Sequence, residues 1–468
     1  MKKNNGILTK IKHFNKVFKN KRTYEIFKTI IVWILCLKNW KQWDLANIWE
    51  KTLTQIQYFF YKSKWTFKTL NYFRINWIRN KIRWCGDKKS DIVILDWTVV
   101  TKNIKSCFSG LANWFFSNRD KKVVNWLEIF WASIITKYWI RYVLDLGIFF
   151  KRKTKRKKDE RKWSLINYAR RKFINKILKY TKAWLLVLDS GFKWANMCKR
   201  IYQVMKRDFL VRIDQEQLFL DSKGKTCKIK KMLNPNNWIL LRSWMLWVIK
   251  WVILKSWDKK WVKIPVNIII HRSNRYRKPL VLVSSADLED IYENMVRKKW
   301  ELSWKEKIKS MTGKRALISA WKELSYYYCF ISLYTKRWSI EECFKELKSY
   351  LCFEQFKVIS YESIMKYLHI VLLVHTLLTI MNHRIALNKE SFNFIYRYLK
   401  EKRNIKKKKT DNHRKITIAW LKLFIEMMFQ SGFIWKIKWR AEKSLNKLIR
   451  NTICVKSISS LEINKKLS

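Results

Sequence analysis

The chain has 468 residues, of which 101 are Lys or Arg and 35 are Asp or Glu, so its formal net charge at pH 7 is +66. Such a charge points to a polyanionic partner, either nucleic acid or an anionic membrane surface. A hydrophobic content of 49% argues against global disorder. The nine cysteines form no Cys-x-x-Cys pair, so the sequence indicates neither a zinc site nor a disulfide framework.

Tryptophan is unusually common in this chain and glycine is unusually rare. There are 28 Trp and 8 Gly, whereas average usage would give roughly 33 glycines in this length. Trp97, directly after Asp96, and Trp257 stand where glycine would read naturally. One hypothesis is that many of these codons are UGA and are read as glycine in the source organism. The alternative is an AT-rich genome that uses UGA for tryptophan, and a peptide mass over Trp97 or Trp126 distinguishes the two.

Residues 1–88 alternate Lys and Arg with aromatic residues and Ile. The stretch 26–36 has the length of a helix, although its β-branched residues leave a strand possible. We expect a basic helical region that contacts DNA; the alternative is a solvated basic packing domain. The polar start lacks the apolar run of a signal peptide, and we expect a soluble protein.

Residues 89–215 read as the first part of a mixed α/β core. Helices are expected up to residue 180 and over 193–207, and strands over 91–96, 122–130, 138–146, 183–189 and 208–214. Asp96 and Asp189 are predicted at the carboxyl ends of strands, where α/β sheets usually bind ligands. Taken singly, each aspartate could instead be a turn former or a helix cap.

Residues 216–333 are predicted to form a β-rich insertion followed by connecting helices. All three prolines lie within 216–285, which reads as antiparallel strands inserted into the α/β core, and residues 286–333 read as mostly helical.

The segment from Tyr334 to Lys348 has the pattern of an amphipathic helix. At about 100° per residue, Tyr334, Arg337, Glu341 and Lys348 share one face. Glu341 would suit a metal ligand, and the other three would hold the oxygens of a phosphodiester. The alternative is an ordinary helix surface with i,i+4 ion pairs.

The second part of the core is predicted over 334–399. Residues 367–386 read as a buried apolar helix rather than a membrane span, and His369 and His375 on it are expected to be core residues rather than ligands. A charged linker over 400–409 leads into a basic helical region that extends over 400–468.

The order of these features resembles the DDE transposases of bacterial insertion sequences. The resemblance covers roughly residues 91–382. It rests on Asp96 at the end of a strand, the Asp-x-Gly-Phe motif that begins at Asp189, and the Tyr-x2-Arg-x3-Glu-x6-Lys signature that begins at Tyr334. The group with this Y-R-E-K signature and a β-strand insertion is the most similar. Trp97 departs from the pattern, because the family usually has a small or acidic residue there.

The resemblance implies a ribonuclease-H-like core in which Asp96, Asp189 and Glu341 bind two Mg²⁺ ions, or Mn²⁺. Tyr334, Arg337 and Lys348 would then bind the DNA end, and an aromatic residue of the insertion would stack on a flipped base. The implied activity is cleavage of the element's ends and joining of the 3′-hydroxyls to target DNA. The implied partners are double-stranded DNA, as terminal inverted repeats and target, and a second copy in a homodimeric synaptic complex. The implied location is cytoplasmic and nucleoid-associated, without a membrane. The alternative is a non-catalytic nucleic-acid-binding protein or an inactive transposase remnant.

Overall fold

The computed structural model describes nineteen stretches of the chain, and every structural statement below concerns these residues. They are 11–36, 53–82, 91–102, 113–117, 122–135, 141–149, 171–192, 195–213, 216, 218–220, 225–229, 239–241, 244–255, 261–273, 279–287, 330–354, 360–387, 389–403 and 417–430. The chain divides into a helical unit, residues 1–78 with 343–468, and a sheet unit, residues 79–342. The helical unit therefore combines the two ends of the chain, which the sequence treats as separate basic regions.

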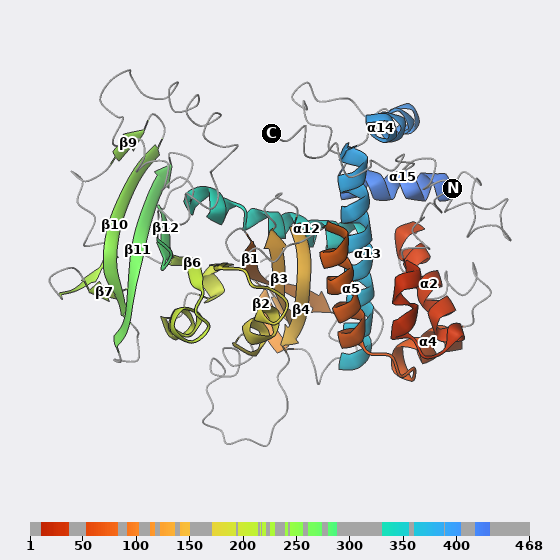
Figure 1. Cartoon of the computed structure of the whole chain (residues 1–468), viewed down its shortest axis with the longest axis horizontal. Helices are drawn as coiled ribbons and strands as arrows, with labels where there is room; N and C mark the ends of the chain where they lie inside the picture. The colour runs from red at the N-terminus through yellow and green to blue at the C-terminus, as the bar shows by residue number, and fades with distance from the viewer. Residues whose placement is uncertain are drawn as a thin grey trace. The chain divides into compact units, whose positions relative to one another are not determined.

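The described elements of the helical unit are all helices (Figure 1). They are the 3₁₀ turn η1 (Lys12–Val17), α2 (Lys21–Cys36), α4 (Leu53–Tyr61), α5 (Phe67–Ile82, which ends in the sheet unit), α12 (Trp338–Tyr350, which begins in the sheet unit), α13 (Tyr361–Leu387), α14 (Lys389–Arg403) and α15 (Ile418–Gln430). The stretch 26–36 is thus helical. The first four residues of the expected linker at 400–409 belong to α14, and the rest of that linker lies outside the described residues.

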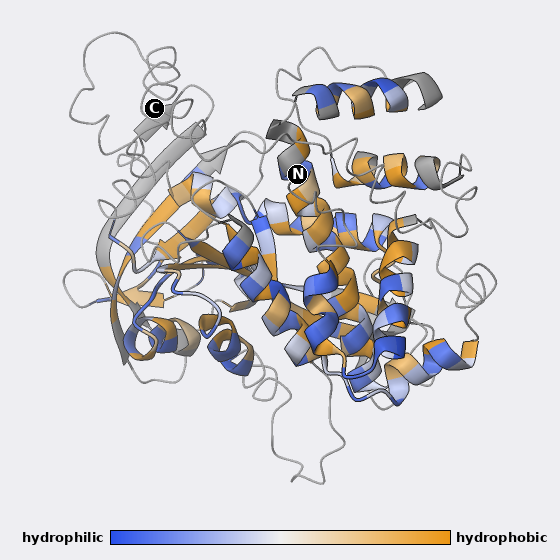
Figure 2. Cartoon of the chain, turned by 45° about the vertical axis from the view of Figure 1, so that its right-hand side comes forward, coloured by the Kyte–Doolittle hydropathy of each residue, from blue (hydrophilic) through white to orange (hydrophobic). Residues whose placement is uncertain are grey.

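Helix α13 is the centre of the helical unit and packs against α2, α4, α14 and α15. Its length follows from an almost unbroken run of apolar residues with few charges. By length and composition it is the one described helix that could cross a membrane, but 94% of its apolar window is buried inside the protein. This burial is typical of a core helix, as the sequence predicts, and Figure 2 shows its hydrophobic residues among those of its neighbours.

The sheet unit contains a single mixed sheet. Its strands are β1 (Ile92–Lys102), β2 (Asn113–Ser117), β3 (Lys122–Ile135), β4 (Arg141–Phe149), β5 (Leu185–Leu188), β6 (Asp208–Ile213), β7 (Leu218–Leu220), β8 (Thr226–Lys228), β9 (Ile239–Leu241), β10 (Trp244–Lys255), β11 (Trp261–Ser273) and β12 (Leu280–Ser284). β1 pairs antiparallel with β3 and parallel with β5, and β5 pairs parallel with β6. β3 also pairs antiparallel with β4 and with β2. The predicted α/β class with a mixed sheet is confirmed.

The strands expected within 216–285 are present and antiparallel. β12 pairs with β6, β11 with β12, and β10 with β11, so the inserted strands continue the same sheet as the core strands. β7 and β9 pair with β10 on its other side, and β8 pairs with β7. The inserted strands are therefore joined to the core strands by the hydrogen bonds between β12 and β6.

Two local features differ from the expectation, and a third expectation lies largely outside the described residues. The strand β2 is not foreseen, because its five residues carry no alternating pattern. The helix expected over 193–207 is a short α7 (Ala195–Lys199) that continues as a π-helical turn, η3 (Arg200–Val204). Of the segment 286–333, residues 288–329 lie outside the described residues, so its predicted helices are not addressed.

Candidate active site

Asp96 and Asp189 lie next to each other on neighbouring parallel strands. The parallel pairing of β1 with β5 ends where Leu95 is opposite Leu188, and each aspartate is the next residue of its chain segment. The Asp189 backbone N–H donates to the Leu95 carbonyl oxygen at 3.2 Å, which fixes this last rung. The two side chains therefore meet at the point where the parallel pairing stops.

The prediction that Asp96 ends its strand is wrong. β1 continues for six residues beyond Asp96, because β3 remains paired with it as far as Lys102 opposite Asn125. The prediction for Asp189 holds, since β5 ends at Leu188 and a 3₁₀ turn, η2 (Ser190–Phe192), follows directly. What the sequence pattern misses at Asp96 is the antiparallel partner, which prolongs the strand after the parallel one has ended.

The signature segment is not one regular helix. Residues 330–335 are helical, Lys336 and Arg337 form a turn, and α12 (Trp338–Tyr350) begins only afterwards. The Arg337 N–H donates to the Tyr334 carbonyl at 2.9 Å, and the Ile340 N–H donates to the Arg337 carbonyl at 2.8 Å. These tighter i→i−3 bonds turn the chain before α12, so the shared face predicted for Tyr334 and Lys348 does not follow from one helical period.

Arg337 brings the three predicted carboxylates together. Its Nη1 lies 2.9 Å from Asp96 Oδ2 and 3.5 Å from Asp189 Oδ1, and its Nη2 lies 3.1 Å from Glu341 Oε1. The Arg337 and Asp96 side chains are buried, whereas the Glu341 side chain is 42% exposed. The group is thus closed on the Asp96 side and open to solvent at Glu341.

The aromatic ring of Tyr334 lies against the guanidinium of Arg337. The Arg337 Cζ lies 5.5 Å from the centre of the Tyr334 ring, within the range of a cation–π contact. Burial raises the pKa of Tyr334 to about 12, against the opposing effect of Arg337, so the phenol is neutral at physiological pH. The neutral Tyr334 ring therefore lies against the guanidinium without adding charge to the site.

The carboxyl of Asp96 has a strongly raised pKa. Burial and then the charge of Asp189 raise the pKa of Asp96 to about 7, although Arg337 and a bond from the Trp97 N–H to Asp96 Oδ1 at 2.8 Å oppose this rise. Three carboxylates share one guanidinium, so negative charge is in excess when all are ionised. Such an excess of negative charge is relieved by a proton, as the raised pKa of Asp96 indicates, or by an additional cation.

Lys348 and Trp97 complete the residues that the resemblance points to. Lys348 lies in the last turn of α12, in the helical unit, and its Nζ is 2.7 Å from Glu354 Oε1. Its role as a phosphate ligand stays a prediction. Trp97 is half-buried in the extended backbone of β1, opposite Phe130. An extended residue needs no glycine, so the backbone gives no conformational reason for glycine at position 97.

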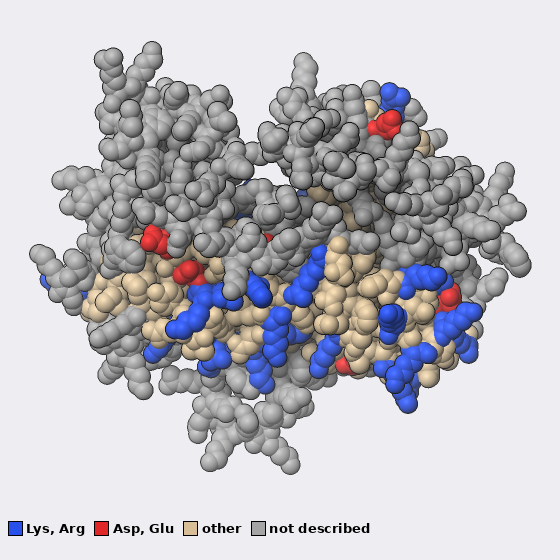
Figure 3. Space-filling model, viewed as in Figure 1, with Lys and Arg blue, Asp and Glu red and all other residues tan. Residues whose placement is uncertain are grey.

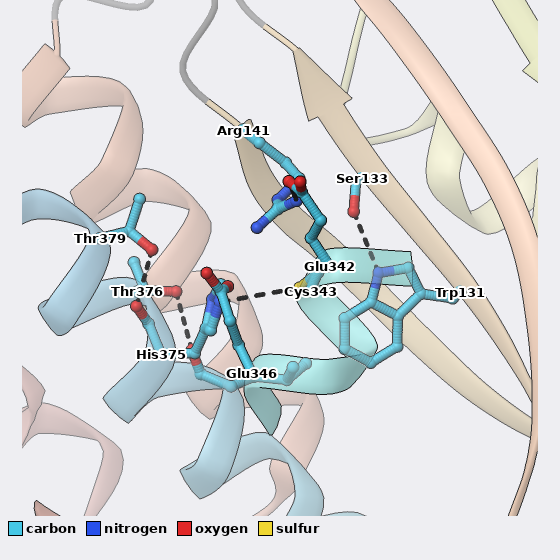
Figure 4. A network of polar contacts seen from close by, with 10 residues as sticks. Trp131, Ser133, Arg141, Glu342, Cys343, Glu346, His375, Thr376 and Thr379 are labelled. Atoms are coloured by element: carbon cyan, nitrogen blue, oxygen red, sulfur yellow. Dashed lines mark hydrogen bonds and ion pairs between the residues drawn. The ribbon is translucent and has the colours of Figure 1, made fainter. Parts of the chain in front are cut away.

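A second group of side chains, which could bind a metal ion, lies in the helical unit. The sequence pattern does not predict this group. Figure 4 shows Cys343 and Glu346 of α12 facing His375 of α13. His375 Nε2 is 3.6 Å from Cys343 Sγ and 3.0 Å from Glu346 Oε2. His369 and His375 are both buried, as predicted. The Cys-x2-Glu spacing of Cys343 and Glu346 was the only hint of this group in the sequence. His375, the third residue of the group, is 29 residues beyond Glu346.

No model of a known protein family matches the chain, and no curated protein is similar to it at a significant level. The candidate site is therefore interpreted from its own geometry.

Proposed function

We propose that the protein is a DDE-type transposase that cleaves the ends of its own insertion sequence and joins the 3′-hydroxyl ends to target DNA. One observation carries this proposal. Asp96, Asp189 and Glu341 come from three distant parts of the chain, and all three form ion pairs with the single guanidinium of Arg337. Ordinary surface ion pairing would account for Glu341 with Arg337, four residues apart, but not for the buried Asp96 and the partly buried Asp189 beside them.

The strand arrangement supports a ribonuclease-H-like core. Its central strands β1, β5 and β6 are parallel, β3 and β4 extend the sheet by antiparallel pairing, and Asp96 lies on β1 while Asp189 directly follows the neighbouring strand β5. This arrangement places acidic side chains from two strands at one edge, where the acidic residue of the signature helix can join them.

The donor set of this site fits Mg²⁺ or Mn²⁺. Asp96, Asp189 and Glu341 offer only carboxylate oxygens, which suit hard divalent cations. When bound, two such ions supply activation of a water or a DNA 3′-hydroxyl and stabilisation of the leaving oxygen. The carboxylates hold the ions, and the raised pKa of Asp96 means that cation binding displaces a proton from this site near neutral pH.

Arg337 and Tyr334 are assigned to the DNA strand near the cut. A guanidinium can hold two phosphate oxygens in a bidentate pair, and the neutral phenol beneath it fixes the plane of that fork. Lys348 would add a third phosphate contact from the end of α12. These residues position the phosphodiester, and none of them needs to become a covalent nucleophile.

Exposed basic side chains provide the sequence-independent part of DNA binding. Six of them lie on or between the first helices of the helical unit: Lys12, Lys16, Lys19, Lys21, Arg22 and Lys68. Figure 3 shows Lys and Arg side chains spread over the described part of one face, with few Asp or Glu. The proposed partners are terminal inverted repeats, target DNA and a second copy of the chain, and the proposed location is the nucleoid.

The test is Mg²⁺-dependent nicking of a labelled DNA that carries the element's terminal inverted repeats. Asp96→Asn, Asp189→Asn and Glu341→Gln should each lower the nicking rate on the order of 10³-fold, because each loses a metal ligand worth several kcal/mol in the transition state. Binding of the same DNA should change far less, since the carboxylates do not contact phosphates.

Glu342→Gln is the matched control. Glu342 is the next residue of α12, its side chain is 77% exposed, and it lies 3.8 Å from Arg141 rather than near Arg337. This variant should nick at the rate of the unaltered protein. Equal nicking by the Glu341→Gln and unaltered proteins would defeat the catalytic assignment.

A non-catalytic nucleic-acid-binding protein, or an inactive remnant of a transposase, is the second candidate. The charge of +66 favours it, because this charge accounts for DNA binding without any role for the carboxylates. Tight binding without nicking by any protein of the series would select this function. Inverted repeats on both sides of the gene would favour the transposase class.

A further inference from the structure

The side chains of Cys343, Glu346 and His375 converge on one point in the helical unit. Their ligand atoms, Sγ, one carboxylate oxygen and an imidazole nitrogen, all lie within 4.8 Å of one another. Cys343 and Glu346 are three residues apart on α12 and so project from the same side of that helix, while His375 comes from α13 (Figure 4). The cluster joins two helices that are separate in the sequence.

We propose that Cys343, Glu346 and His375 form a site for Zn²⁺ that fastens α12 to α13. Thiolate, imidazole and carboxylate are the three ligand types that this ion takes in proteins. The mixture of one sulfur, one nitrogen and one oxygen argues against Mg²⁺, which prefers oxygen ligands alone. This site is separate from the carboxylates around Arg337 and does not depend on their function.

The sulfur–nitrogen distance matches a tetrahedral ion at the centre of the cluster. Zn–S of about 2.3 Å and Zn–N of about 2.0–2.1 Å at a tetrahedral angle place the sulfur about 3.6 Å from the nitrogen. The separation between Cys343 Sγ and His375 Nε2 is 3.6 Å. The same geometry requires about 3.4 Å between nitrogen and oxygen, against 3.0 Å between His375 Nε2 and Glu346 Oε2. The carboxylate, on a 21% exposed side chain, needs to retreat by only a small distance.

A Cys–His–Glu catalytic triad is a less suitable interpretation of the same residues. In a triad the base contacts the nucleophile with one ring nitrogen and its orienting carboxylate with the other. Here both Cys343 Sγ and Glu346 Oε2 approach the same Nε2 of His375. Cys343 is also fully buried, so a substrate would not reach its sulfur. Sulfur, nitrogen and oxygen atoms that approach one another in this way are arranged like the ligands of a metal ion rather than like a catalytic triad.

The backbone around His375 is held by threonines and by a buried arginine. Thr379 Oγ1 donates to the His375 carbonyl at 2.9 Å, and Arg74 Nη1 donates to Thr376 Oγ1 at 3.0 Å. Arg74 lies on α5 and is itself fully buried, so α13 is fixed at this turn from a third helix. Because the Glu346 side chain is 21% exposed, a water could reach the cluster and serve as a fourth ligand.

The experiment uses the full-length protein, stripped with EDTA, and measures Zn²⁺ bound per chain by equilibrium dialysis in excess Mg²⁺. Cys343→Ser and His375→Gln should each bind one equivalent less than the unaltered protein. Co²⁺ is the second probe, because a thiolate ligand gives it a near-ultraviolet charge-transfer band that should be lost in Cys343→Ser. Cys198→Ser is the matched control, since Cys198 is a buried free cysteine of the sheet unit.

Glu346→Gln keeps the inference testable if the buried substitutions fail to fold. It keeps the size of the side chain and removes the anionic ligand. Zn²⁺ should raise the melting midpoint of the unaltered protein, EDTA should reverse the rise, and Glu346→Gln should show a smaller rise. Asp96→Asn should bind Zn²⁺ like the unaltered protein, which separates this site from the proposed active site. Equal Zn²⁺ stoichiometry in the unaltered protein and the cluster variants would overturn the proposal, and so would an equal rise in Glu346→Gln.

Discussion

Arg337 is the residue on which the electrostatics of the candidate active site depend. Its side chain is buried and neutralises two neighbouring aspartates, one of them almost fully removed from water. A buried carboxylate that loses its cation is left uncompensated, and this costs far more than the pair contributes. Arg337 therefore has a structural task in addition to the phosphate contact proposed for it.

Arg337→Met should lower the free energy of unfolding in EDTA by about 3–5 kcal/mol, because Asp96 and Asp189 lose their shared partner. Arg337→Lys should recover part of this loss, since the ammonium keeps the charge but not the fork. Urea unfolding measures both. Added Mg²⁺ should reduce the deficit of Arg337→Met if the carboxylates bind the ion. An Arg337→Met protein as stable as the unaltered one in EDTA would contradict the structural task.

His271 provides a pH-dependent contribution to stability away from the candidate site. It lies on β11, and burial lowers the pKa of His271 below the ordinary value of 6.5. The unfolded chain therefore binds a proton more readily than the folded one. The neutral histidine contributes stability that is fully present above about pH 6.5 and is lost as the pH falls through the folded pKa.

His271→Gln should show a shallower loss of stability on acidification, because glutamine does not titrate. Urea midpoints of the two proteins should be compared at pH 7.5, 6.5 and 5.5. The difference between the proteins at pH 7.5 reports packing alone and serves as the internal reference. If the urea midpoints of the two proteins fall in parallel over the whole pH range, His271 does not contribute to the loss of stability at low pH.

At the scale of elements, β4 is joined to the helical residues 171–178 by one charged and one apolar contact. The Lys176 Nζ lies 2.6 Å from Asp145 Oδ2, and the Asp145 side chain is fully buried. A Cβ at Gly147 would come within 3.0 Å of the Phe173 ring, which also lies against Phe130. The absence of a side chain at Gly147 therefore lets the helix approach the sheet closely.

Lys176→Met should destabilise the protein by about 2–3 kcal/mol, below the 3–5 kcal/mol of a fully buried pair, because Lys176 is itself partly exposed. Lys179→Met, an exposed position one turn further along, should change the stability by less than about 0.5 kcal/mol. Thermal unfolding of the two variants gives the comparison. Similar melting temperatures would mean that Asp145 obtains its compensation elsewhere.

The elements were predicted well where the sequence pattern was itself local. Apolar runs bounded by charges located β1, β5, β6 and β11, and unbroken hydrophobicity located α13 as a buried helix. The end of β1 and the turn at Lys336 and Arg337 could not be predicted, because they depend on the partner strand β3 and on tertiary contacts of Arg337. The same holds for the Cys343 cluster, whose members meet only when α12 packs near His375.

At the scale of the whole molecule, the dominant feature is the charge of +66 on 468 residues. Exposed Lys and Arg side chains are widely distributed over the described residues rather than gathered in one tail (Figure 3). A surface of this kind should neutralise many phosphates at once and release their counterions. The net charge follows from composition alone, and the DNA binding that it indicates stays a prediction.

DNA binding should accordingly weaken steeply with salt, on the order of 10³-fold or more between 50 and 200 mM if at least six phosphates are neutralised. Fluorescence anisotropy with a labelled duplex measures the slope of log K against log salt. A duplex with uncharged methylphosphonate linkages is the control and should bind weakly with a shallow slope. A flat dependence on salt for the ordinary duplex would contradict an electrostatic interface.

The pairing of β6 with β12 has a consequence for how this chain can be modified. Since Val211 is opposite Val283 within one continuous sheet, the residues between β6 and β12 are not a removable module. Their excision would remove β11 and leave the backbone groups of β12 that pair with it as an open edge, the kind of surface on which chains aggregate. Shortened forms of this protein are therefore better designed by trimming the loops between the inserted strands than by removing the strands themselves.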